Sequence, residues 1–442
     1  MTLRIRYGDD CTTENLVNVS TSSYTFSADQ HNAFHRIVKF LGNPAENFFV
    51  LRGYAGTGKT YLLKAIEQIL DRGGFVYTSP TNKATKVLRK TLGLRASNCK
   101  TIYSLLGVKM VAENEFLTLQ FPVRPVDIGV YSLIVIDEAS VLNREMTEYV
   151  IELAQMHGAK ILFVGDKAQL PPVGETESPV WSIKCPSASL EEVMRFDNEL
   201  LELATHIRRQ IQKFPDVKLR LWSNHGDTEG VWKLKRSSWD KSIRRAAFHG
   251  LFLEVDSTKA VAWRNRTVEG INAIVRQEIH GGRAKKHWLV GDRILVSEPI
   301  QVASFVVAHV DDEGTITECY EATHTFHPQI LTYHLTVQFD GASSVTLYVV
   351  HEDSEGELQV QLSRLAQEAR KDRSKWGAFW ALKNSFHRIR YSYALTSHRA
   401  QGSTYTNAFI DSADILASSD SLESLRCLYV ACTRATTKLL IS

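Results

Sequence analysis

The sequence lacks the long hydrophobic runs that mark membrane and secreted proteins. No stretch approaches the roughly 18–20 apolar residues of a membrane span, and Met1–Arg6 opens the chain without the apolar core of a signal peptide. We therefore expect a cytoplasmic, intracellular protein with no membrane partner.

Cysteines are few and show no pairing pattern. None belongs to a C-x-x-C cluster or to a set with zinc-ligand spacing, so we expect free thiols rather than bridges or a metal knuckle. The six are Cys11, Cys99, Cys185, Cys319, Cys427 and Cys432.

Net charge is also small. The 52 Lys and Arg residues against 49 Asp and Glu residues give +3, too weak a surplus to prove a nucleic-acid partner, although a neutral chain can still carry one basic channel. The hydrophobic share of 44% and charged share of 23% exclude a collagen-like, coiled-coil or disordered chain. At roughly 150 residues per domain, 442 residues predict a multidomain protein whose function must be sought in motifs.

Apolar strands and amphipathic helices alternate along most of the chain. This alternation predicts an α/β fold with a doubly wound parallel sheet, and then a second α/β unit that opens near 259–263, continues in a helix at 267–279 and resumes near 393. In the first unit we expect strands at 47–51, 75–79, 133–136 and 161–164 and helices at 82–92 and 143–156.

Two insertions interrupt this alternation. Short β-like runs between about 290 and 350 predict a small inserted barrel, followed by a charged helical segment at 357–383. A second pair of short runs at 111–121 predicts a protruding hairpin. Phe116 lies between these runs as either an exposed wedge or a residue that packs the hairpin onto the sheet, and the sequence favours neither reading.

A glycine-rich loop stands between the first strand and its helix. Residues 53–60, GYAGTGKT, match G-x-x-x-x-G-K-[ST], in which backbone N–H groups surround phosphate oxygens. Lys59 is expected to reach the terminal phosphates, and Thr60 offers a hydroxyl to Mg²⁺. The residues expected to hold the nucleotide here are Gly53, Ala55, Gly56, Thr57, Gly58, Lys59 and Thr60.

Acidic and amide side chains follow two further strands. Asp137 and Glu138 end the apolar run 133–136, at the edge where an open α/β sheet binds its ligand. Asp137 can hold Mg²⁺, and Glu138 can orient or deprotonate the attacking water. Gln169, after the strand at 161–164, could sense the γ-phosphate. Taken alone, the acid pair would suit a helix cap and Gln169 an ordinary turn.

The order of the motifs carries a family resemblance. The phosphate loop is followed by PTNKA at 80–84, DEAS at 137–140, GDKAQLPP at 165–172, TSHRAQG at 396–402 and YVACTR at 429–434. This series resembles superfamily 1 helicases, and the AQG ending with the inserted barrel is most similar to the 5′-to-3′, RecD/Dda-like group. The resemblance covers about residue 26 to the C-terminus and implies ATP and Mg²⁺ as cofactors.

The same resemblance assigns roles at the nucleotide. Gln30 looks like the glutamine that reads the adenine edge, and its amide has the right donor and acceptor pair. Arg195 and Arg434 resemble the two arginine fingers that neutralise phosphate charge, whereas the sequence alone would make both of them surface ion-pair residues. Gln401 and Gly402 resemble further nucleotide-site residues.

A surface for single-stranded nucleic acid is implied as well. Its short polar side chains can grip phosphates and sugars without reading bases. The residues implied are Pro80, Thr81, Asn82, Lys83, Thr101, Tyr103, Thr396 and His398, with Tyr103 at a place where related sequences often have His. Four aromatic residues could add stacking platforms or belong to a core, which their helical spacing favours: Trp376, Phe379, Trp380 and Phe386.

The fold implied is α/β, with two RecA-like doubly wound domains, a hairpin insertion in the first and a small SH3-like β-barrel in the second. We expect a polar extension at 1–25, domain 1A at 26–185 with its hairpin at about 107–128, domain 2A at 186–288 and 386–442, and the inserted module at 289–385.

The activity implied is that of an ATP-dependent DNA helicase that moves 5′ to 3′ on single-stranded DNA and opens duplex junctions. We expect a monomer, cellular or phage-encoded, that serves replication, repair or recombination with protein partners of those processes. The alternatives are an RNA-directed superfamily 1 helicase and a P-loop switch without motor activity.

Overall fold

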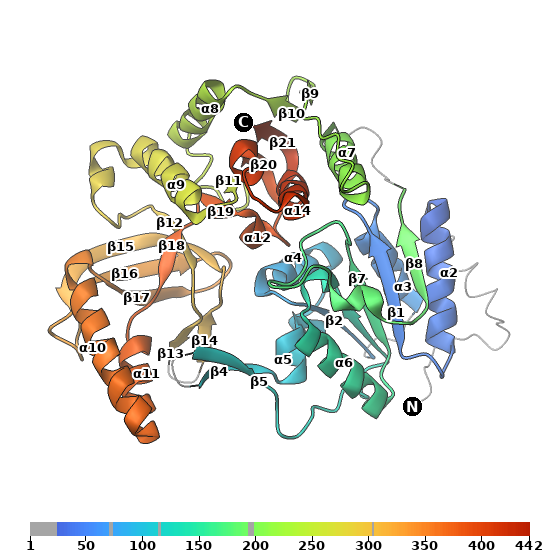
Figure 1. Cartoon of the computed structure of the whole chain (residues 1–442), viewed down its shortest axis with the longest axis horizontal. Coiled ribbons are helices and arrows are strands. Elements are labelled where there is room, and N and C mark those ends of the chain that lie inside the picture. Colours follow the sequence, from blue (N-terminus) through green and yellow to red (C-terminus); the bar gives the residue numbers. More distant parts are fainter. Residues whose placement is uncertain (1–23, 70–73, 114–115, 193–198, 303–304) are drawn as a thin grey trace.

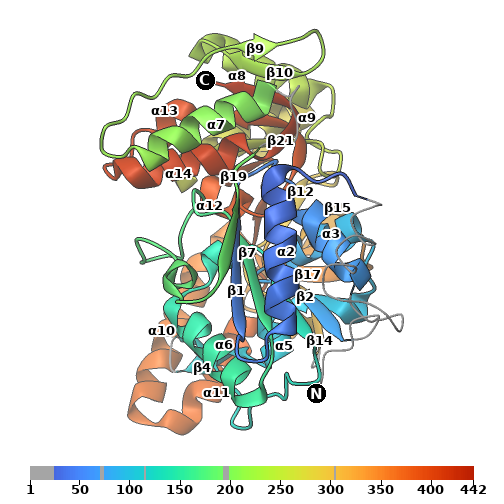
Figure 2. The same cartoon turned by 90° about the vertical axis from the view of Figure 1, so that its right-hand side faces the viewer.

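Two α/β domains and an inserted β module make up the protein (Figure 1). The structure is a computed structural model that describes residues 24–69, 74–113, 116–192, 199–302 and 305–442. The first domain, which carries the N-terminal half of the chain, lies below the second in the side view, and the inserted module lies beside both (Figures 1 and 2).

The first domain is built on a six-stranded parallel sheet in the order β3-β2-β6-β7-β1-β8. All four residues of the strand LIVI at 133–136 are buried, as expected for a parallel strand covered by helices on both faces. The strands are β1 (Phe48–Gly53), β2 (Phe75–Ser79), β3 (Cys99–Thr101), β6 (Leu133–Ile136), β7 (Ile161–Gly165) and β8 (Ser187–Leu190).

Helices cover both faces of this sheet, which confirms the predicted doubly wound arrangement. The apolar sides of α2, α3 and α4 pack in one core cluster, and those of α5 and α6 pack in the other. The helices are α2 (Ala28–Gly42), α3 (Lys59–Ile69), α4 (Asn82–Leu92), α5 (Ile102–Leu106) and α6 (Arg144–His157).

The second sheet has the order β19-β11-β20-β21-β10-β9, parallel except for the edge pair β9 and β10. Its strands are β9 (Asn224–His225), β10 (Gly230–Lys233), β11 (Thr258–Ala262), β19 (Ala394–Thr396), β20 (Tyr405–Ile410) and β21 (Ala435–Ile441). Helices α7 and α14 pack in one core cluster and α8 and α9 in another. The helices are α7 (Glu199–Gln212), α8 (Arg236–Phe248), α9 (Asn265–His280), α12 (Ser397–Ala400), α13 (Ser412–Ile415) and α14 (Ser421–Cys432).

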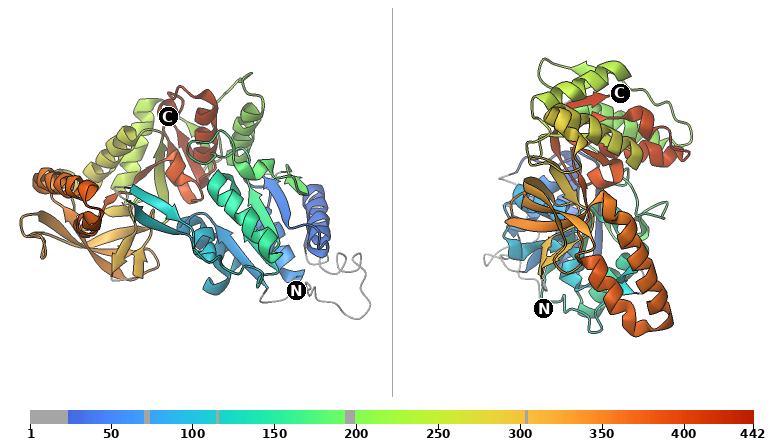
Figure 3. Two further views of the ribbon diagram at one scale, coloured as in Figure 1. Left: turned by 60° about the horizontal axis from the view of Figure 1, so that its bottom comes forward. Right: turned by 90° about the vertical axis from the view of Figure 1, so that its left-hand side faces the viewer.

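The inserted module is a five-stranded antiparallel sheet with a short hairpin and two helices. The sheet strands are β12 (Arg293–Val296), β15 (Glu313–Thr323), β16 (Leu331–Phe339), β17 (Ser344–Val350) and β18 (Ile389–Tyr391). The hairpin is β13 (Ile300–Val302) with β14 (Phe305–Ala308), and the helices are α10 (Glu352–Lys371) and α11 (Trp376–Asn384). The two helices lie along the outer side of the module (Figure 3).

Two expected domain boundaries need correction. The strand β8 at 187–190 follows the boundary expected at residue 185, yet it pairs with β1 and completes the first sheet. The strand β18 at 389–391 follows the boundary expected at residue 385, yet it pairs with β12 of the inserted sheet. Both strands are too short to be assigned without their partners.

The four aromatic residues of the charged helical segment form a core, as their spacing favours. Phe379 and Phe386 are buried, and Trp376 and Trp380 pack against the same apolar cluster. Phe379 and Phe386 are therefore not available as stacking platforms for bases, whereas Trp376 and Trp380 are only partly buried.

The predicted hairpin is present as β4 (Lys109–Glu113) and β5 (Phe116–Gln120), with Glu113 opposite Phe116. It extends from the first domain toward the inserted module (Figures 1 and 3). The Phe116 side chain lies outside the part of the chain that the structure describes, so its role stays a prediction.

Membrane and disulfide features are absent from the described residues. None of the helices there combines the length and apolar character required to cross a membrane. The described cysteines, Cys99, Cys185, Cys319, Cys427 and Cys432, are free thiols, as predicted.

Candidate nucleotide and nucleic-acid site

The glycine-rich loop joins β1 to α3 and faces the second domain. Gly56 and Gly58 adopt φ values of 79° and 77°, which favour glycine, and a Cβ added at Gly56 would lie 2.8 Å from Leu201 Cδ2 of α7. Lys59 Nζ donates to the carbonyls of Gly53 at 2.8 Å and Tyr54 at 3.0 Å. The loop thus holds its lysine at the phosphate-binding turn, with Thr60 next to it in the first turn of α3.

The acid pair ends β6 beside this loop. Glu138 has the unusual φ of 54°, and its N–H donates to Asp137 Oδ1 at 2.9 Å. Burial raises the pKa of Asp137, although the charge of Lys59 opposes the rise. Burial, together with the Asp137 charge, raises the pKa of Glu138 to about 7, while Arg434 and Lys59 oppose that rise. A carboxyl with a pKa near neutrality is suited to accept a proton from water.

The end of β7 contributes a third polar group. Asp166 is fully buried, and its Oδ1 accepts the N–H of Ala168 at 2.9 Å. The Gln169 side chain accepts a hydrogen bond from Gln401 Nε2 of the second domain at 3.0 Å. Two glutamines that the sequence assigned to the nucleotide therefore meet each other across the domain junction.

A tyrosine of the second domain, to which the sequence reasoning gave no role, bridges the same junction. The Tyr429 hydroxyl on α14 donates to Asp166 Oδ2 at 2.6 Å and accepts the N–H of Ala55 at 3.2 Å. Tyr429 thus connects the phosphate loop to the acidic end of β7. Tyr429 lies in the motif YVACTR, five residues before Arg434, and this position is the feature of the sequence that could have identified it.

Tyr54 of the phosphate loop makes a second contact to α7. The Arg208 guanidinium lies over its ring, 3.9 Å from the centroid, and Gln212 Nε2 donates to its hydroxyl at 2.8 Å. Both partners were missed, because their positions on an otherwise ordinary amphipathic helix carry no motif.

Arg434 is buried at the end of α14. Its guanidinium donates to the carbonyls of Val430 and Ser403, both at 2.9 Å, and to the Thr433 hydroxyl at 2.8 Å. Burial lowers the pKa of Arg434, and the charge of Glu138 acts against this. The three hydrogen-bond partners of Arg434 all lie in the second domain. Arg195 lies outside the described residues, so its role as a second finger stays a prediction.

Gln30 packs against the phosphate loop with 1% of its surface exposed. Its Nε2 donates to the Thr57 carbonyl at 3.1 Å, and its Oε1 accepts the N–H of Ser27 at 3.1 Å, which completes a capping box at the start of α2. The structure places Gln30 at the nucleotide end of the sheet. Its adenine-reading role stays a prediction.

Three threonines of the expected nucleic-acid surface share one geometry. Thr81, Thr101 and Thr396 follow β-strands and cap α4, α5 and α12, and each hydroxyl accepts a backbone N–H from three residues ahead. A hydroxyl that accepts such a bond keeps its own proton for a phosphate or sugar oxygen. Pro80 and Asn82 flank Thr81, and Tyr103 is half-buried against the core.

The remaining expected contacts are differently placed. His398 on α12 has its Nε2 3.6 Å from Glu423 Oε1, and Gly402, with φ of 75°, brings its loop against Ala84 of α4. The Lys83 ammonium does not face an open surface, because it is paired with Glu313 of the inserted module at 2.8 Å.

The residues present fit a magnesium nucleotide. The loop offers backbone N–H groups and one ammonium, while the Thr60 hydroxyl and Asp137 carboxylate are the hard oxygen ligands that Mg²⁺ prefers. Burial raises the pKa values of the two adjacent acids by more than the nearby positive charge of Lys59 lowers them. A bound divalent cation would supply further positive charge.

Comparisons with known proteins agree with this geometry. Residues 25–227 match the family described as AAA domain, and residues 391–442 match the UvrD-like helicase C-terminal domain. Uncharacterized protein R530 of Acanthamoeba polyphaga mimivirus is 23% identical, with 94% of this chain and 99% of that protein covered. The ATP-dependent DNA helicase dda of Enterobacteria phage T4 is 25% identical, with 86% and 91% covered.

A solved structure of two coordinating Pif1 helicases at forked double-stranded DNA has a TM-score of 0.52 and 15% identity, covering 94% of this chain and 92% of that one. This likeness supports the fold. Together with the ordered motifs, these matches confirm that the chain is similar to superfamily 1 helicases of the 5′-to-3′ group.

Proposed function

We propose that this protein is an ATP-dependent DNA helicase that moves 5′ to 3′ on single-stranded DNA and separates duplex DNA. The observation that carries the proposal is the junction at the phosphate loop, where Tyr429 and Gln401 of one α/β domain contact Ala55 and Gln169 of the other. A nucleotide at this place would touch both domains, so its hydrolysis can change how they sit together.

Each side chain at the site has a separate role in ATP hydrolysis. Lys59 binds the terminal phosphates, and Thr60 and Asp137 hold Mg²⁺, which neutralises phosphate charge when bound. Glu138 accepts the proton of the attacking water, for which its pKa of about 7 is suited. Arg434, with Arg195 as a second finger, stabilises charge on the transferred phosphoryl group, and Gln30 selects adenine.

The junction also provides a route by which ATP hydrolysis can change the contacts to the nucleic acid. Gln169 and Gln401 contact each other across the junction, and Gln401 lies in the turn that follows Thr396 and His398. A change at the phosphates is therefore passed within a few residues to the threonine and histidine that we assign to the DNA. Alternation of the domain contacts moves the DNA along these hydroxyls.

The finer assignments belong to the same proposal. We assign the inserted antiparallel sheet to an SH3-like barrel and the β4–β5 hairpin to duplex separation. We expect a monomer that works with replication, repair or recombination proteins. An RNA-directed helicase is the alternative, since hydroxyl contacts to phosphates do not select the sugar.

Two measurements test the proposal. Single-stranded DNA should stimulate ATP hydrolysis, which a P-loop switch without motor activity would not show. Duplexes with a 5′ tail should be unwound and those with a 3′ tail should not. Unwinding of matched RNA duplexes at equal or greater rate would favour the RNA-directed alternative.

A further inference from the structure

Three consecutive acids of the inserted module lie between the two motor domains. Asp311 and Asp312 precede β15, Glu313 is its first residue, and each acid has a different partner. Asp311 Oδ1 is 3.1 Å from Arg399 of α12, and Asp312 Oδ1 is 2.7 Å from Lys86 of α4. Glu313 binds Lys83 of α4 at 2.8 Å and Lys259 of β11 at 2.5 Å. We name residues 311–313 the acidic turn.

The helix that receives this turn carries a row of cations. Lys83, Lys86 and Lys90 follow one another at i, i+3 and i+7, with Arg89 beside them, so the row spans roughly 10 Å of helix. These four side chains line one side of a cavity of about 630 Å³ between α4 and the other two domains. We name them the basic face of α4.

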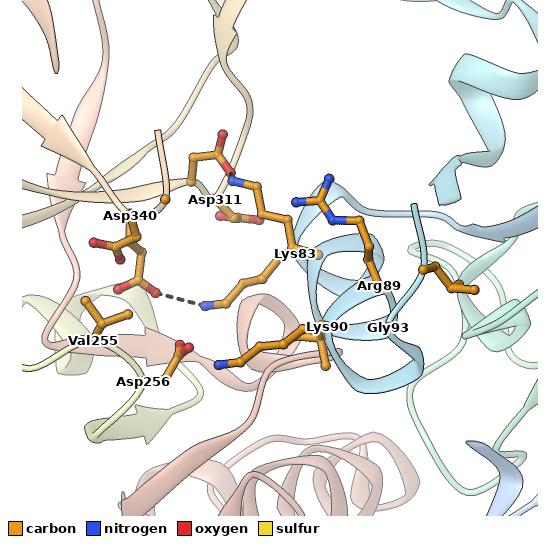
Figure 4. A pocket seen from close by; sticks show the side chains of 14 residues that line it. Lys83, Arg89, Lys90, Gly93, Val255, Asp256, Asp311 and Asp340 are labelled. Atoms are coloured by element: carbon orange, nitrogen blue, oxygen red, sulfur yellow. Dashed lines mark hydrogen bonds and ion pairs between the residues drawn. The ribbon is translucent and has the colours of Figure 1, made fainter. Parts of the chain in front are cut away.

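The opposite wall of the cavity is acidic. Asp256 and Asp340 join the acidic turn there, and Figure 4 shows Lys83 and Lys90 directed across the space toward these carboxylates. The basic face begins one residue after Asn82 and two after Thr81, both assigned to the DNA. A nucleic-acid backbone that passes Thr81 would therefore meet these cations next.

The carboxylates of the acidic turn keep other partners if the lysines of α4 move away from them. If Lys83 leaves, Glu313 keeps Lys259 and also Arg293, whose guanidinium is 3.4 Å away. If Lys86 leaves, Asp312 keeps the N–H of His309 at 2.9 Å. No buried carboxylate would lose all of its partners, which is the costly outcome.

On the α4 side, Lys86 is easier to release than Lys83. The Lys86 side chain is 48% exposed, so its ion pair with Asp312 is worth little by itself. Lys83 is more enclosed, with 18% of its side chain exposed, and also donates to the Tyr405 hydroxyl at 2.9 Å. Phosphate oxygens offer Lys83 and Lys86 the same type of charged acceptor that the acidic turn offers.

We propose that the basic face of α4 is a binding surface for the sugar-phosphate backbone of single-stranded nucleic acid, and that the acidic turn occupies it until that backbone takes its place. This inference rests on the proposed function and adds regulation to it. The acidic turn lowers the affinity of the resting protein for nucleic acid. Binding of nucleic acid therefore releases the inserted module from α4.

The test compares Asp312→Asn with Glu321→Gln in the full chain. Asp312→Asn weakens the hold on Lys86, while Glu321→Gln removes one exposed charge from the far end of β15. Binding of a fluorescein-labelled oligodeoxythymidylate is followed by anisotropy over a salt series. We expect Asp312→Asn to bind about two- to five-fold more tightly at low salt, with a log–log salt slope steeper by about 0.7, and Glu321→Gln to match the parent.

A second pair of variants tests the basic face of α4 directly. Lys90→Ala should weaken binding and make the salt slope shallower by about 0.7, whereas Lys64→Ala, at an exposed position of α3, should leave both unchanged. This pair does not disturb the acidic turn, so it stays informative if Asp312→Asn fails to fold.

Three results would overturn the inference. They are parent-like binding by Asp312→Asn and Lys90→Ala, equal gains in Asp312→Asn and Glu321→Gln, and a gain seen with a blunt duplex alone. Failure of the helicase proposal can be distinguished from these three results. In that case the parent protein itself would show no stimulation of its ATPase activity by DNA.

Discussion

At the scale of single residues, the nucleotide site depends on polar atoms that have partners in both domains. The Tyr429 hydroxyl is the clearest case, since it binds a backbone N–H of the phosphate loop and a buried carboxylate at once. Such a group positions the loop without touching substrate. We therefore separate it from Lys59 and Glu138, which we propose act on the nucleotide.

Lys59→Ala should leave the fold intact and reduce ATP turnover by at least about 100-fold, because it removes the charge on the terminal phosphates. Steady-state ATPase rates with and without DNA measure the effect, and circular dichroism checks the fold. Substantial turnover in the variant would contradict the assignment of the loop.

Glu138 predicts a pH dependence. As a base it must be ionised, so DNA-stimulated ATPase should fall as the pH drops through about 7, and Glu138→Gln should lose about 100- to 10,000-fold in kcat. The rate is measured from pH 5.5 to 9 at ATP concentrations well below KM, because kcat/KM reports the pKa of the nucleotide-free enzyme. A flat profile in the parent would remove Glu138 from the role of base.

The stability of the nucleotide-free protein should change with pH in the opposite direction to the ATPase rate. The folded pKa of Glu138 lies above its unfolded value of about 4.3, so the folded state binds the proton more tightly, and ionisation between these two values costs stability. Without nucleotide, Glu138→Gln should therefore melt at a higher temperature than the parent at pH 8, and the gap should close near pH 4.

Tyr429→Phe should weaken the connection between the domains. The buried Asp166 carboxylate loses a hydrogen bond, which costs about 1–3 kcal/mol of stability. The loop also loses an acceptor for Ala55 N–H, so we expect KM for ATP to rise more than kcat falls. Thermal melts and steady-state kinetics check both effects, and a loss confined to kcat would point to a direct role in catalysis.

At the scale of elements, the β4–β5 hairpin carries the sharpest prediction. If Phe116 is a wedge, its ring replaces a stacking partner at the junction, where each base-pair step costs roughly 1.4 kcal/mol to open. Phe116→Ala should then slow duplex unwinding, while DNA-stimulated ATPase and movement on single strands stay near normal.

The three activities of this variant separate the readings of Phe116. Equal loss of all three would indicate that the ring packs the hairpin onto the domain. Unchanged unwinding would place the wedge elsewhere. A gel-based unwinding assay and a streptavidin-displacement assay on single strands provide the measurements.

Elements with local signals could be predicted from the sequence, and those defined by distant partners could not. The helix α4 has the predicted bounds because Thr81 caps its start and Gly93, with φ of 69°, ends it. The short strands β8 and β18 become strands only through pairing with β1 and β12. Lys83 was expected to contact nucleic acid, and its pairing with Glu313, 230 residues away, has no local signal.

The same division applies to the site. Lys59 and Asp137 could be proposed from the sequence because their chemistry requires a fixed spacing, and Gln401 could be proposed from the family resemblance. Arg208 and Gln212 support Tyr54 from a helix with no motif, so only the packed structure reveals them.

At the scale of the whole molecule, the proposed DNA surface of hydroxyl donors belongs to a chain with a small net charge of +3. Affinity for single-stranded DNA should fall as salt rises, with a log–log slope near −0.7 for each phosphate neutralised, and should depend little on base sequence. Titrations with oligodeoxythymidylate and a mixed-sequence oligonucleotide over a salt series measure both. A strong preference for one short sequence at fixed salt would contradict a general motor.

The order of strands in the second sheet has a consequence for biosynthesis. Strand β21 comes after the inserted module in the chain, yet it occupies an interior position between β20 and β10. All six strands of the first sheet precede residue 191, so that domain can fold while the ribosome is still translating the rest. The second domain must wait for residues 435–441. A nascent chain therefore completes the first sheet well before Tyr429 can contact the phosphate loop. Under the proposed function, ATP hydrolysis should begin only after translation has passed the last strand of the second sheet.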